Sequence, residues 1–362
     1  MRIVLTLFLF FHGLLHFLGF VRAFAIGSMA EFTKEFSKPV GLLWLLTGLL
    51  FVLSALMILF RKEGWHWFVF MAAIVSQFLI LTVWADAKYG TIANVMLLIV
   101  AIVGLGTERF ENGYKKDVVS AMESATLFDE RITENDLSHL PFPVQNNLRY
   151  VGVLGKPRVY NFKIRFEGAM RDKGKDWFQF TSEQYNFIAS PARLFFMKAK
   201  VKGLPTAGYH AYKRRHVGML IKLLSLFPVV NIDSQELFAT ETVTFFNDLC
   251  LFAPAALIDD RIVWEAIDDI SAKATFTTNG TSISAILHFN QKGQLVNFVS
   301  EDRISVSEMT TFPFSTPIKN YKNVNGYKLP TYGEAIWHYP DGEFIYGRFN
   351  LKSVEYNVTE LQ

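Results

Sequence analysis

The sequence predicts a membrane four-helix bundle followed by an α+β domain, in which a curved, mainly antiparallel sheet packs against a long helix. Three observations predict this. Charged residues are sparse up to about residue 106 and ordinary in frequency after it. The first part holds four apolar runs of about 20 residues, and from Pro157 the hydrophobic pattern changes to a period of two. We expect a bundle over 1–106, a charged helical linker over 107–136 and the α+β domain over 137–362.

The four apolar runs are each long enough to cross a hydrocarbon core of about 30 Å at a rise of about 1.5 Å per residue. They are Ile3–Phe24, Val40–Phe60, Trp65–Ala85 and Tyr89–Gly106. Charges and helix breakers separate them, as in "EFTKEFSKP", "RKEG" and "DAK". An even number of spans places both termini on one side of the membrane.

The distribution of basic residues predicts which side that is. The side of the termini has Arg2, Arg61, Lys62, Arg109, Lys115 and Lys116, and the other side has Arg22, Lys34, Lys38 and Lys88. Because cytoplasmic loops carry an excess of Lys and Arg, this bias favours a cytoplasmic C-terminal domain. We therefore expect a multi-pass membrane protein whose C-terminal domain lies in the cytoplasm.

Polar side chains inside the predicted spans are candidates for function, because each costs free energy unless it has a partner. His12 and His16 lie four residues apart on one helix face, and Gly19 on the same face lets a neighbouring helix approach closely. The predicted intramembrane polar cluster consists of His12, His16, Gln77, Asp86 and Asn94.

Several chemistries can be weighed for this cluster. Haem needs axial ligands from opposite sides, which His12 and His16 on one helix cannot supply. Zinc needs a third ligand, and Asp86 is expected nearer the membrane surface. We predict no metal and no cofactor here. Two readings remain, namely hydrogen bonds that hold the bundle together and a proton-relay or small-molecule transport role.

The C-terminal half is predicted as a sheet with one helix. Alternating segments such as "SISAILHFN" and "QLVNFVSED" are separated by turn signals such as "TNGT" and "NQKG". One helix interrupts them from Ser234 to Phe252, with Ser234 as its cap and Pro254 after its end. Its apolar face is expected to pack on the sheet, whose concave side is either filled by the helix or keeps an apolar pocket. That face consists of Leu237, Val243, Phe246, Leu249 and Cys250.

No familiar catalytic motif is present in the sequence. It has no Gly-rich phosphate loop, no G-x-S-x-G and no H-E-x-x-H. Cys250, the single cysteine, lies on the apolar helix face and is expected to be a core thiol. The sequence favours a protein without catalytic activity and leaves an enzyme open as the alternative.

A basic stretch is the strongest charge pattern. Between Gln184 and Ile232 there is no acidic residue. The basic side chains could face anionic headgroups, or they could pair with the acids of the following segment, Asp233–Asp269. With a net charge of +3 and no stacking motif, nucleic acid is not an expected partner. The candidates for headgroup contact are Lys198, Lys200, Lys202, Lys213, Arg214 and Arg215.

Several segments carry a resemblance to a known family. They are "HGLLHFLGF", "SQFLILTVWADAKYGTIANV", "LPFPVQNNLRYVG", "FTSEQYNF", "IKLLSLFPVVNIDSQEL", "LFAPAALIDDRIVWEAIDD" and "PTYGEAIWHYPDGEFIYGRF". Over nearly its whole length the chain resembles a family of uncharacterised bacterial membrane proteins with a C-terminal domain of unknown function. The β-rich half also resembles, at fold level, the half-barrel of periplasmic lipoprotein carriers and related lipid-binding domains. That likeness implies an extracytoplasmic location, against the charge distribution.

These observations predict a membrane protein whose soluble domain binds a lipid-like or apolar ligand without catalysis. An enzyme or a small-molecule or proton transporter that uses the intramembrane polar cluster is the alternative from another class. A scaffold or assembly factor for other membrane proteins is a third. The expected partners are membrane lipids, an apolar small ligand and a membrane-protein partner.

Overall fold

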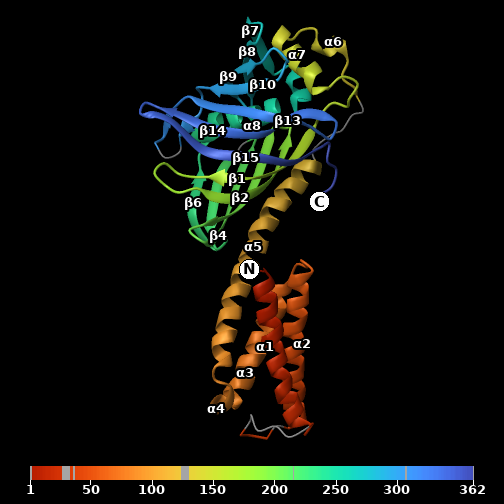
Figure 1. Cartoon of the computed structure of the whole chain (residues 1–362), viewed down its shortest axis with the longest axis vertical. Helices are drawn as coiled ribbons and strands as arrows, with labels where there is room; N and C mark the ends of the chain where they lie inside the picture. Colours follow the sequence, from red (N-terminus) through yellow and green to blue (C-terminus); the bar gives the residue numbers. More distant parts are fainter. Residues whose placement is uncertain are drawn as a thin grey trace. The chain divides into compact units, whose positions relative to one another are not determined.

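The computed structural model describes residues 2–26, 33–35, 37–123, 130–214, 216–305 and 308–361. The chain forms two compact units, Met1–Phe110 and Glu111–Gln362 (Figure 1). The boundary between them lies within α5 (Gly90–Glu123), which is continuous through both.

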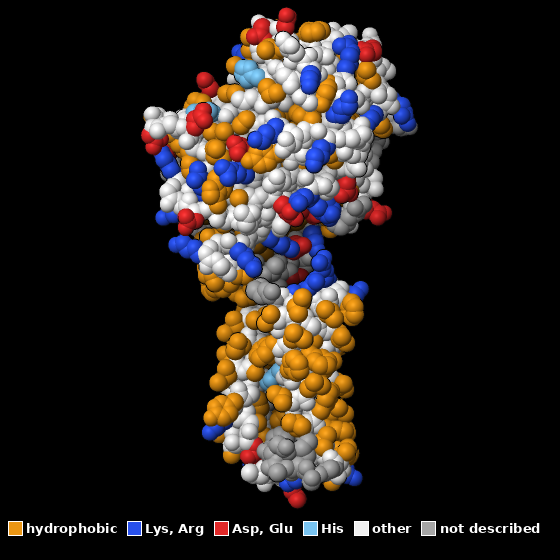
Figure 2. All heavy atoms as spheres, viewed as in Figure 1, with side chains coloured by type: hydrophobic (Ala, Val, Ile, Leu, Met, Phe, Trp, Pro, Cys, Tyr) orange, Lys and Arg blue, Asp and Glu red, His pale blue; other side chains and the backbone are white. Residues whose placement is uncertain are grey.

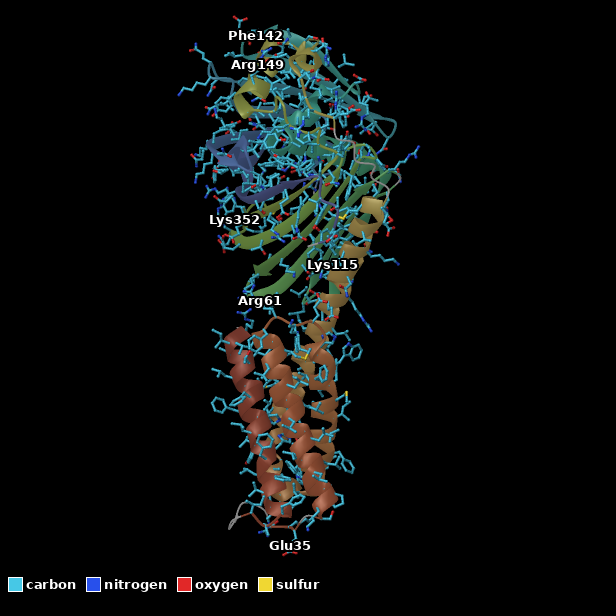
Figure 3. All side chains as sticks on the ribbon, turned by 90° about the vertical axis from the view of Figure 1, so that its right-hand side faces the viewer. Glu35, Arg61, Lys115, Phe142, Arg149 and Lys352 are labelled. Carbon is cyan, nitrogen blue, oxygen red and sulfur yellow. The ribbon has the colours of Figure 1, made fainter. Side chains whose placement is uncertain are left out.

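The first unit is helical. Its long helices are α1 (Arg2–Ala23), α2 (Lys38–Leu59), α3 (Trp65–Thr82) and the first part of α5, and α4 (Trp84–Ala87) is a single turn. Within the described residues, four helices are long and apolar enough to cross a membrane, as the sequence predicts. Leu9, Phe51, Val69 and Leu97 form the centre of their shared core. Apolar side chains also cover the outside of this unit (Figure 2), and the labelled Glu35 and Arg61 lie at its opposite ends (Figure 3).

Two of the predicted spans end at other residues in the structure than the sequence predicts. Val83 leaves the helical conformation, with φ −130° and ψ 42°, and therefore divides the third predicted span into α3 and α4. The fourth predicted span continues as one helix to Glu123, since no Pro and no Gly-rich break follows Gly106. The rest of the predicted linker includes residues 124–129, which lie outside the described residues.

Small residues let α1 and α2 approach closely. A Cβ on Gly13 would lie 2.9 Å from the carbonyl oxygen of Gly48, and a Cβ on Gly19 would lie 2.4 Å from the ring of Trp44. Side chains at these positions would force the helices apart. The glycines thus bring the backbone of α2 against the face of α1 that carries His12 and His16.

The second unit is built on one large antiparallel sheet of 13 strands, curved and not closed. Its order is β6-β5-β4-β3-β2-β1-β15-β14-β13-β10-β9-β8-β7, so β6 and β7 are the two edges. The strands are β1 (Asn161–Met170), β2 (Phe178–Phe187), β3 (Ala192–Val201), β4 (Leu204–Lys213), β5 (His216–Leu223), β6 (Phe227–Asp233), β7 (Ile262–Asp268), β8 (Ser271–Thr278), β9 (Thr281–Phe289), β10 (Leu295–Ser300), β13 (Phe314–Val324), β14 (Tyr327–Tyr339) and β15 (Gly342–Tyr356).

Short elements complete this unit. The helices α6 (Glu134–Leu137) and α7 (Phe142–Val151) precede the sheet, and a small two-stranded sheet, β11 (Ile304–Ser305) with β12 (Thr310–Thr311), joins β10 to β13. The 3-10 turns η1 (Gln235–Leu237) and η2 (Pro254–Ile258) flank α8 (Phe238–Phe252), which lies within the curve of the sheet (Figure 1). The predicted fold class, a membrane-type helix bundle with an α+β domain, is confirmed.

The helix α8 packs through the face that the sequence predicts. Phe246 stacks on Phe276 of β8 with ring centroids 5.1 Å apart and contacts Phe298 of β10 at 6.0 Å. Val243 and Leu249 are also fully buried there. The opposite face of α8 is therefore directed towards the remaining part of the concave side of the sheet.

Candidate functional site

A cavity of about 680 Å³ lies in the second unit, on the side of the sheet that carries α8. Its size falls in the range of about 300–1,000 Å³ that is usual for small-molecule sites. Strands β1 to β6 and β13 to β15 contribute its walls together with α8. Apolar side chains form much of the lining, among them Phe166, Met197, Met219, Ile221, Val230, Ile232, Leu251 and Ile318.

The helix α8 presents a polar stripe to this cavity. Thr240, Thr244, Asn247 and Leu251 line it at spacings of three and four residues, which places them on one side of a helix. Asn247 donates from Nδ2 to Thr316 Oγ1 at 2.9 Å, and its Oδ1 has no hydrogen-bond partner in the described part of the chain. The α8 side of the cavity thus offers hydroxyl and amide groups beside the apolar side chains of the strands.

A buried charged network links α8 to the sheet. Arg193 of β3 donates from Nε to Asp248 at 2.8 Å and from a terminal nitrogen to Gln184 Oε1 at 3.0 Å. Gln184 in turn donates to Asp248 at 2.6 Å, and Glu241 lies 3.7 Å from Arg193. Burial raises the pKa of the Asp248 carboxyl, while Arg193 opposes that shift. The guanidinium is thus the single cation that balances two buried carboxyl groups in this network.

His210 of β4 also lines the cavity. Burial lowers the pKa of its imidazole to about 4, with Arg193 and Arg303 acting in the same direction and Glu241 opposing them. Its ring meets the ring of Phe195 edge-on at 5.8 Å. Near neutral pH this histidine is therefore uncharged.

Two arginines and a set of aromatic rings form one wall of the cavity, which we call the arginine–aromatic wall. The guanidinium of Arg303 lies 4.1 Å from the ring centroid of Phe314 and 5.1 Å from that of Trp337. The guanidinium of Arg171 lies 5.1 Å from that of Phe344. All of these residues line the cavity. The wall consists of Arg171, Arg303, Phe314, Trp337, Tyr339, Phe344 and Tyr346.

The predicted intramembrane residues fall into two places. His12, His16 and Asn94 join with Ser76 in a closed ring of hydrogen bonds. His12 Nε2 lies 3.1 Å from Asn94 Oδ1, and Asn94 Nδ2 lies 2.9 Å from Ser76 Oγ. Ser76 Oγ lies 2.8 Å from His16 Nε2, and His16 Nδ1 lies 2.8 Å from the carbonyl oxygen of His12.

Gln77 extends the ring through Asn94 at 3.2 Å and Thr91 at 3.1 Å. Asp86 is not part of it, since its carboxylate accepts instead from the backbone and hydroxyl of Thr33. Ser76 was missed from the sequence, although it immediately precedes Gln77 on the same helix.

The predicted basic stretch is divided in the structure. Lys198 pairs with Glu111, and Lys213 pairs with Asp117 at 2.9 Å, both acids lying on the part of α5 that belongs to the second unit. Lys200 is on β3, Lys202 is in the β3–β4 turn, and Arg214 follows β4. Arg215 lies outside the described residues. Contact of this stretch with headgroups stays a prediction.

The described residues contain no group of three or more His, Cys, Asp or Glu side chains that could hold a metal ion. The cavity residues Gln184, Glu241, Asp248 and Arg303 were not singled out from the sequence. One signal was available, because Glu241 and Asp248 are the two acidic residues of α8, lie seven residues apart and therefore share a face.

Comparison with protein families identifies the C-terminal half of the chain. A family of unknown function, DUF6544, matches residues 130–349. The chain belongs to this family. The DUF6544 segment contains α8 and every residue of the cavity lining except Leu351. The predicted membership in a family with a C-terminal domain of unknown function is confirmed.

No curated protein matches the chain. Among solved structures, a LolA superfamily protein from Nitrosomonas europaea is similar at 11% sequence identity with a TM-score of 0.34. The similarity covers 59% of this chain and 94% of that protein.

Proposed function

We propose that the DUF6544 domain of this membrane-associated chain binds a lipid-like or other apolar ligand in the cavity beside α8, without transforming it. The observation that supports this most is the cavity itself, with about 680 Å³ of space and a largely apolar lining inside the curve of an open sheet. Each methylene group that moves from water into such a space contributes about 0.8 kcal/mol. A long acyl chain therefore gains more there than a compact polar metabolite.

The polar groups around the cavity support a binding role. Arg193, Gln184 and Asp248 are engaged with one another, which fixes their positions between β2, β3 and α8. Burial raises the pKa of the Cys250 thiol well above its usual value. A thiol in that state is a poor nucleophile at neutral pH.

A photoreactive acyl probe tests the proposal. The full-length protein is reconstituted in phosphatidylcholine nanodiscs with a long-chain fatty alcohol that carries a diazirine, and labelled peptides are quantified by mass spectrometry. We expect label on β5, β6 and α8, with labelling of α1 to α3 as the internal reference for probe in the bilayer.

Neighbouring valines on β6 provide matched variants. Val230 lines the cavity, whereas Val229 is 57% exposed. Val230→Trp should fill the cavity and remove most of its label, and Val229→Trp should leave it unchanged. Equal labelling of the cavity peptides in both variants, or none in the wild type, would overturn the proposal.

We also propose that the chain is a multi-pass protein of a bacterial inner membrane with its C-terminal domain in the cytoplasm, on the basis of its basic residues. The single native cysteine is buried, so introduced cysteines can report sidedness. Lys352→Cys should be protected from an impermeant maleimide in intact cells, and Glu35→Cys, at the end of the helical unit away from Arg61 (Figure 3), should react. The reverse pattern would place the domain outside.

A further inference from the structure

Arg303 is an unusual cavity residue because it has no acidic partner. Within the described residues, no carboxylate oxygen lies within 4.0 Å of its nitrogens, although Asp172, Glu241 and Asp248 line the same cavity. Its one hydrogen bond to a side chain runs from a terminal nitrogen to the hydroxyl of Tyr346 at 3.0 Å, and its Nε is buried without a partner. A guanidinium carries five N–H donors, so the described residues use only part of its hydrogen-bonding capacity.

The surrounding structure holds Arg303 in place. The next residue, Ile304, donates its backbone N–H to Thr240 Oγ1 of α8 at 2.8 Å, and the Arg303 carbonyl accepts from Phe312 at 3.2 Å. The preceding residue, Asp302, accepts from the backbone N–H of Ser284 at 2.6 Å. Hydrogen bonds on both sides of Arg303 therefore restrict its backbone before a ligand binds. This reduces the conformational entropy that the protein loses on binding.

Arg171 adds a second cation to the same wall. Its Nε donates to the carbonyl oxygen of Ile345 at 2.9 Å, and its guanidinium lies 4.5 Å from the ring centroid of Trp177. It too has no carboxylate within 4.0 Å in the described part of the chain. The two acids on α8, in contrast, both face Arg193. Asp172 also lines the cavity, but in the described part of the chain neither guanidinium of the arginine–aromatic wall has a carboxylate oxygen within 4.0 Å.

From this arrangement we infer that the ligand is an anionic amphiphile. The apolar lining takes its acyl chain, and Arg303, supported by Arg171, binds an anionic oxygen group at the end of that chain. A carboxylate and a phosphate both fit this chemistry, since each accepts paired bonds from a guanidinium. The inference rests on the proposed function. That proposal places the apolar part of the ligand in the cavity, and the inference adds the anionic head group.

Comparison of two probes tests the inference. The photoreactive fatty acid and the matching fatty alcohol share the acyl chain and differ in charge. Because a hydrogen bond to a charged group contributes about 1.5–3 kcal/mol, we expect the acid to occupy the cavity at a concentration at least about tenfold lower than the alcohol. Labelling of the helical unit corrects for the amount of each probe in the bilayer.

Substitutions locate the effect at Arg303. Arg303→Gln should raise the acid concentration needed for half-maximal labelling about tenfold, to that of the alcohol, and leave the alcohol value unchanged. Arg303→Lys should restore part of the preference, since it keeps the charge. Arg149→Gln, which removes an exposed arginine of α7 that pairs with Glu134, is the matched control and should behave as the wild type. Thermal unfolding confirms that each variant is folded.

Competition separates the sources of the anion. Lysophosphatidic acid should displace the acid probe, whereas inorganic phosphate at the same concentration should not. Displacement by inorganic phosphate alone would mean that the wall binds a free anion and would overturn the inference. Equal labelling by acid and alcohol, with no effect of Arg303→Gln, would also overturn it and leave the proposed function standing. If neither probe labels the cavity, the proposed function fails as well.

Discussion

Two clusters of buried polar side chains, one in each unit of the chain, differ in how fully their atoms are hydrogen-bonded. In the helical unit, His12, Asn94, Ser76 and His16 form a ring in which each member both gives and receives a bond. In the cavity wall, Glu241 Oε2, Asn247 Oδ1 and Arg303 Nε are buried without a hydrogen-bond partner among the described residues. Buried polar atoms are normally paired.

This difference indicates that the buried polar side chains of the two clusters have different roles. A closed ring has its donors and acceptors directed at its own members, which favours its interpretation as an interaction that holds the helices together. An open cluster beside a cavity has donors and acceptors that the described residues do not use, which favours the proposed ligand site. The transporter or enzyme reading of the intramembrane cluster stays a prediction, and we regard the cavity as the stronger candidate for function.

The largest effect is expected at Arg193, the cation that Asp248 and Glu241 share. Arg193→Met leaves Asp248 and Glu241 without their counter-charge in a buried place, and such a loss costs about 3–5 kcal/mol. Chemical denaturation of the full-length protein, followed by the fluorescence of the domain, measures the change in unfolding free energy. Lys352→Met removes an exposed pair with Glu167 and should cost at most about 1 kcal/mol. Similar costs for the two variants would contradict the role of Arg193.

The second prediction compares two asparagines directly. Asn94→Leu breaks the closed ring in the helical unit and should destabilise it by about 1–2 kcal/mol. Asn247→Leu removes one hydrogen bond to Thr316 and an unpaired oxygen, so the cost should be below about 1 kcal/mol. Resistance to unfolding in SDS measures the first, and thermal unfolding measures the second. The contrast between the clusters fails if Asn247 proves the more costly of the two.

The smallest effect at neutral pH is expected at His210, which changes the stability only when the solution is acidified. Its folded pKa of about 4 lies below the ordinary 6.5 of an unfolded chain, so the unfolded state takes up a proton first as the pH falls. The stability due to the neutral ring is complete above pH 6.5 and is lost as the pH decreases towards 4, at up to about 1.4 kcal/mol per pH unit. His210→Gln should reduce the slope of unfolding free energy against pH in this range. Identical slopes in wild type and variant would rule out this source.

The sequence was sufficient for features that depend on local periodicity. The four apolar helices and the packed face of α8, with Val243, Phe246 and Leu249, follow from residue spacing alone. The continuity of α5 beyond Gly106 was predictable in part, since the segment was expected to be helical but was assigned to a separate linker.

The cavity could not be predicted in the same way, because distant segments form it. Arg193 on β3 meets Asp248 on α8, and Arg303, which stands in the short segment "EDRIS" between strands, meets Phe314 and Trp337 only after β13 and β14 are paired. Nothing local in "EDRIS" distinguishes its arginine from a solvated one. Which buried charges remain unpaired depends on contacts between distant segments, and local sequence patterns do not show those contacts.

The open sheet has a mechanical consequence for the cavity. Its edges, β6 and β7, are not joined by a ladder of backbone hydrogen bonds, so the width of the sheet's curve is set by side-chain packing around α8. A closed barrel would have to break such a ladder to admit a bulky guest, whereas this sheet can widen by sliding apolar side chains past one another. If the proposed function holds, ligands of different chain length will share one site at a small difference in deformation energy.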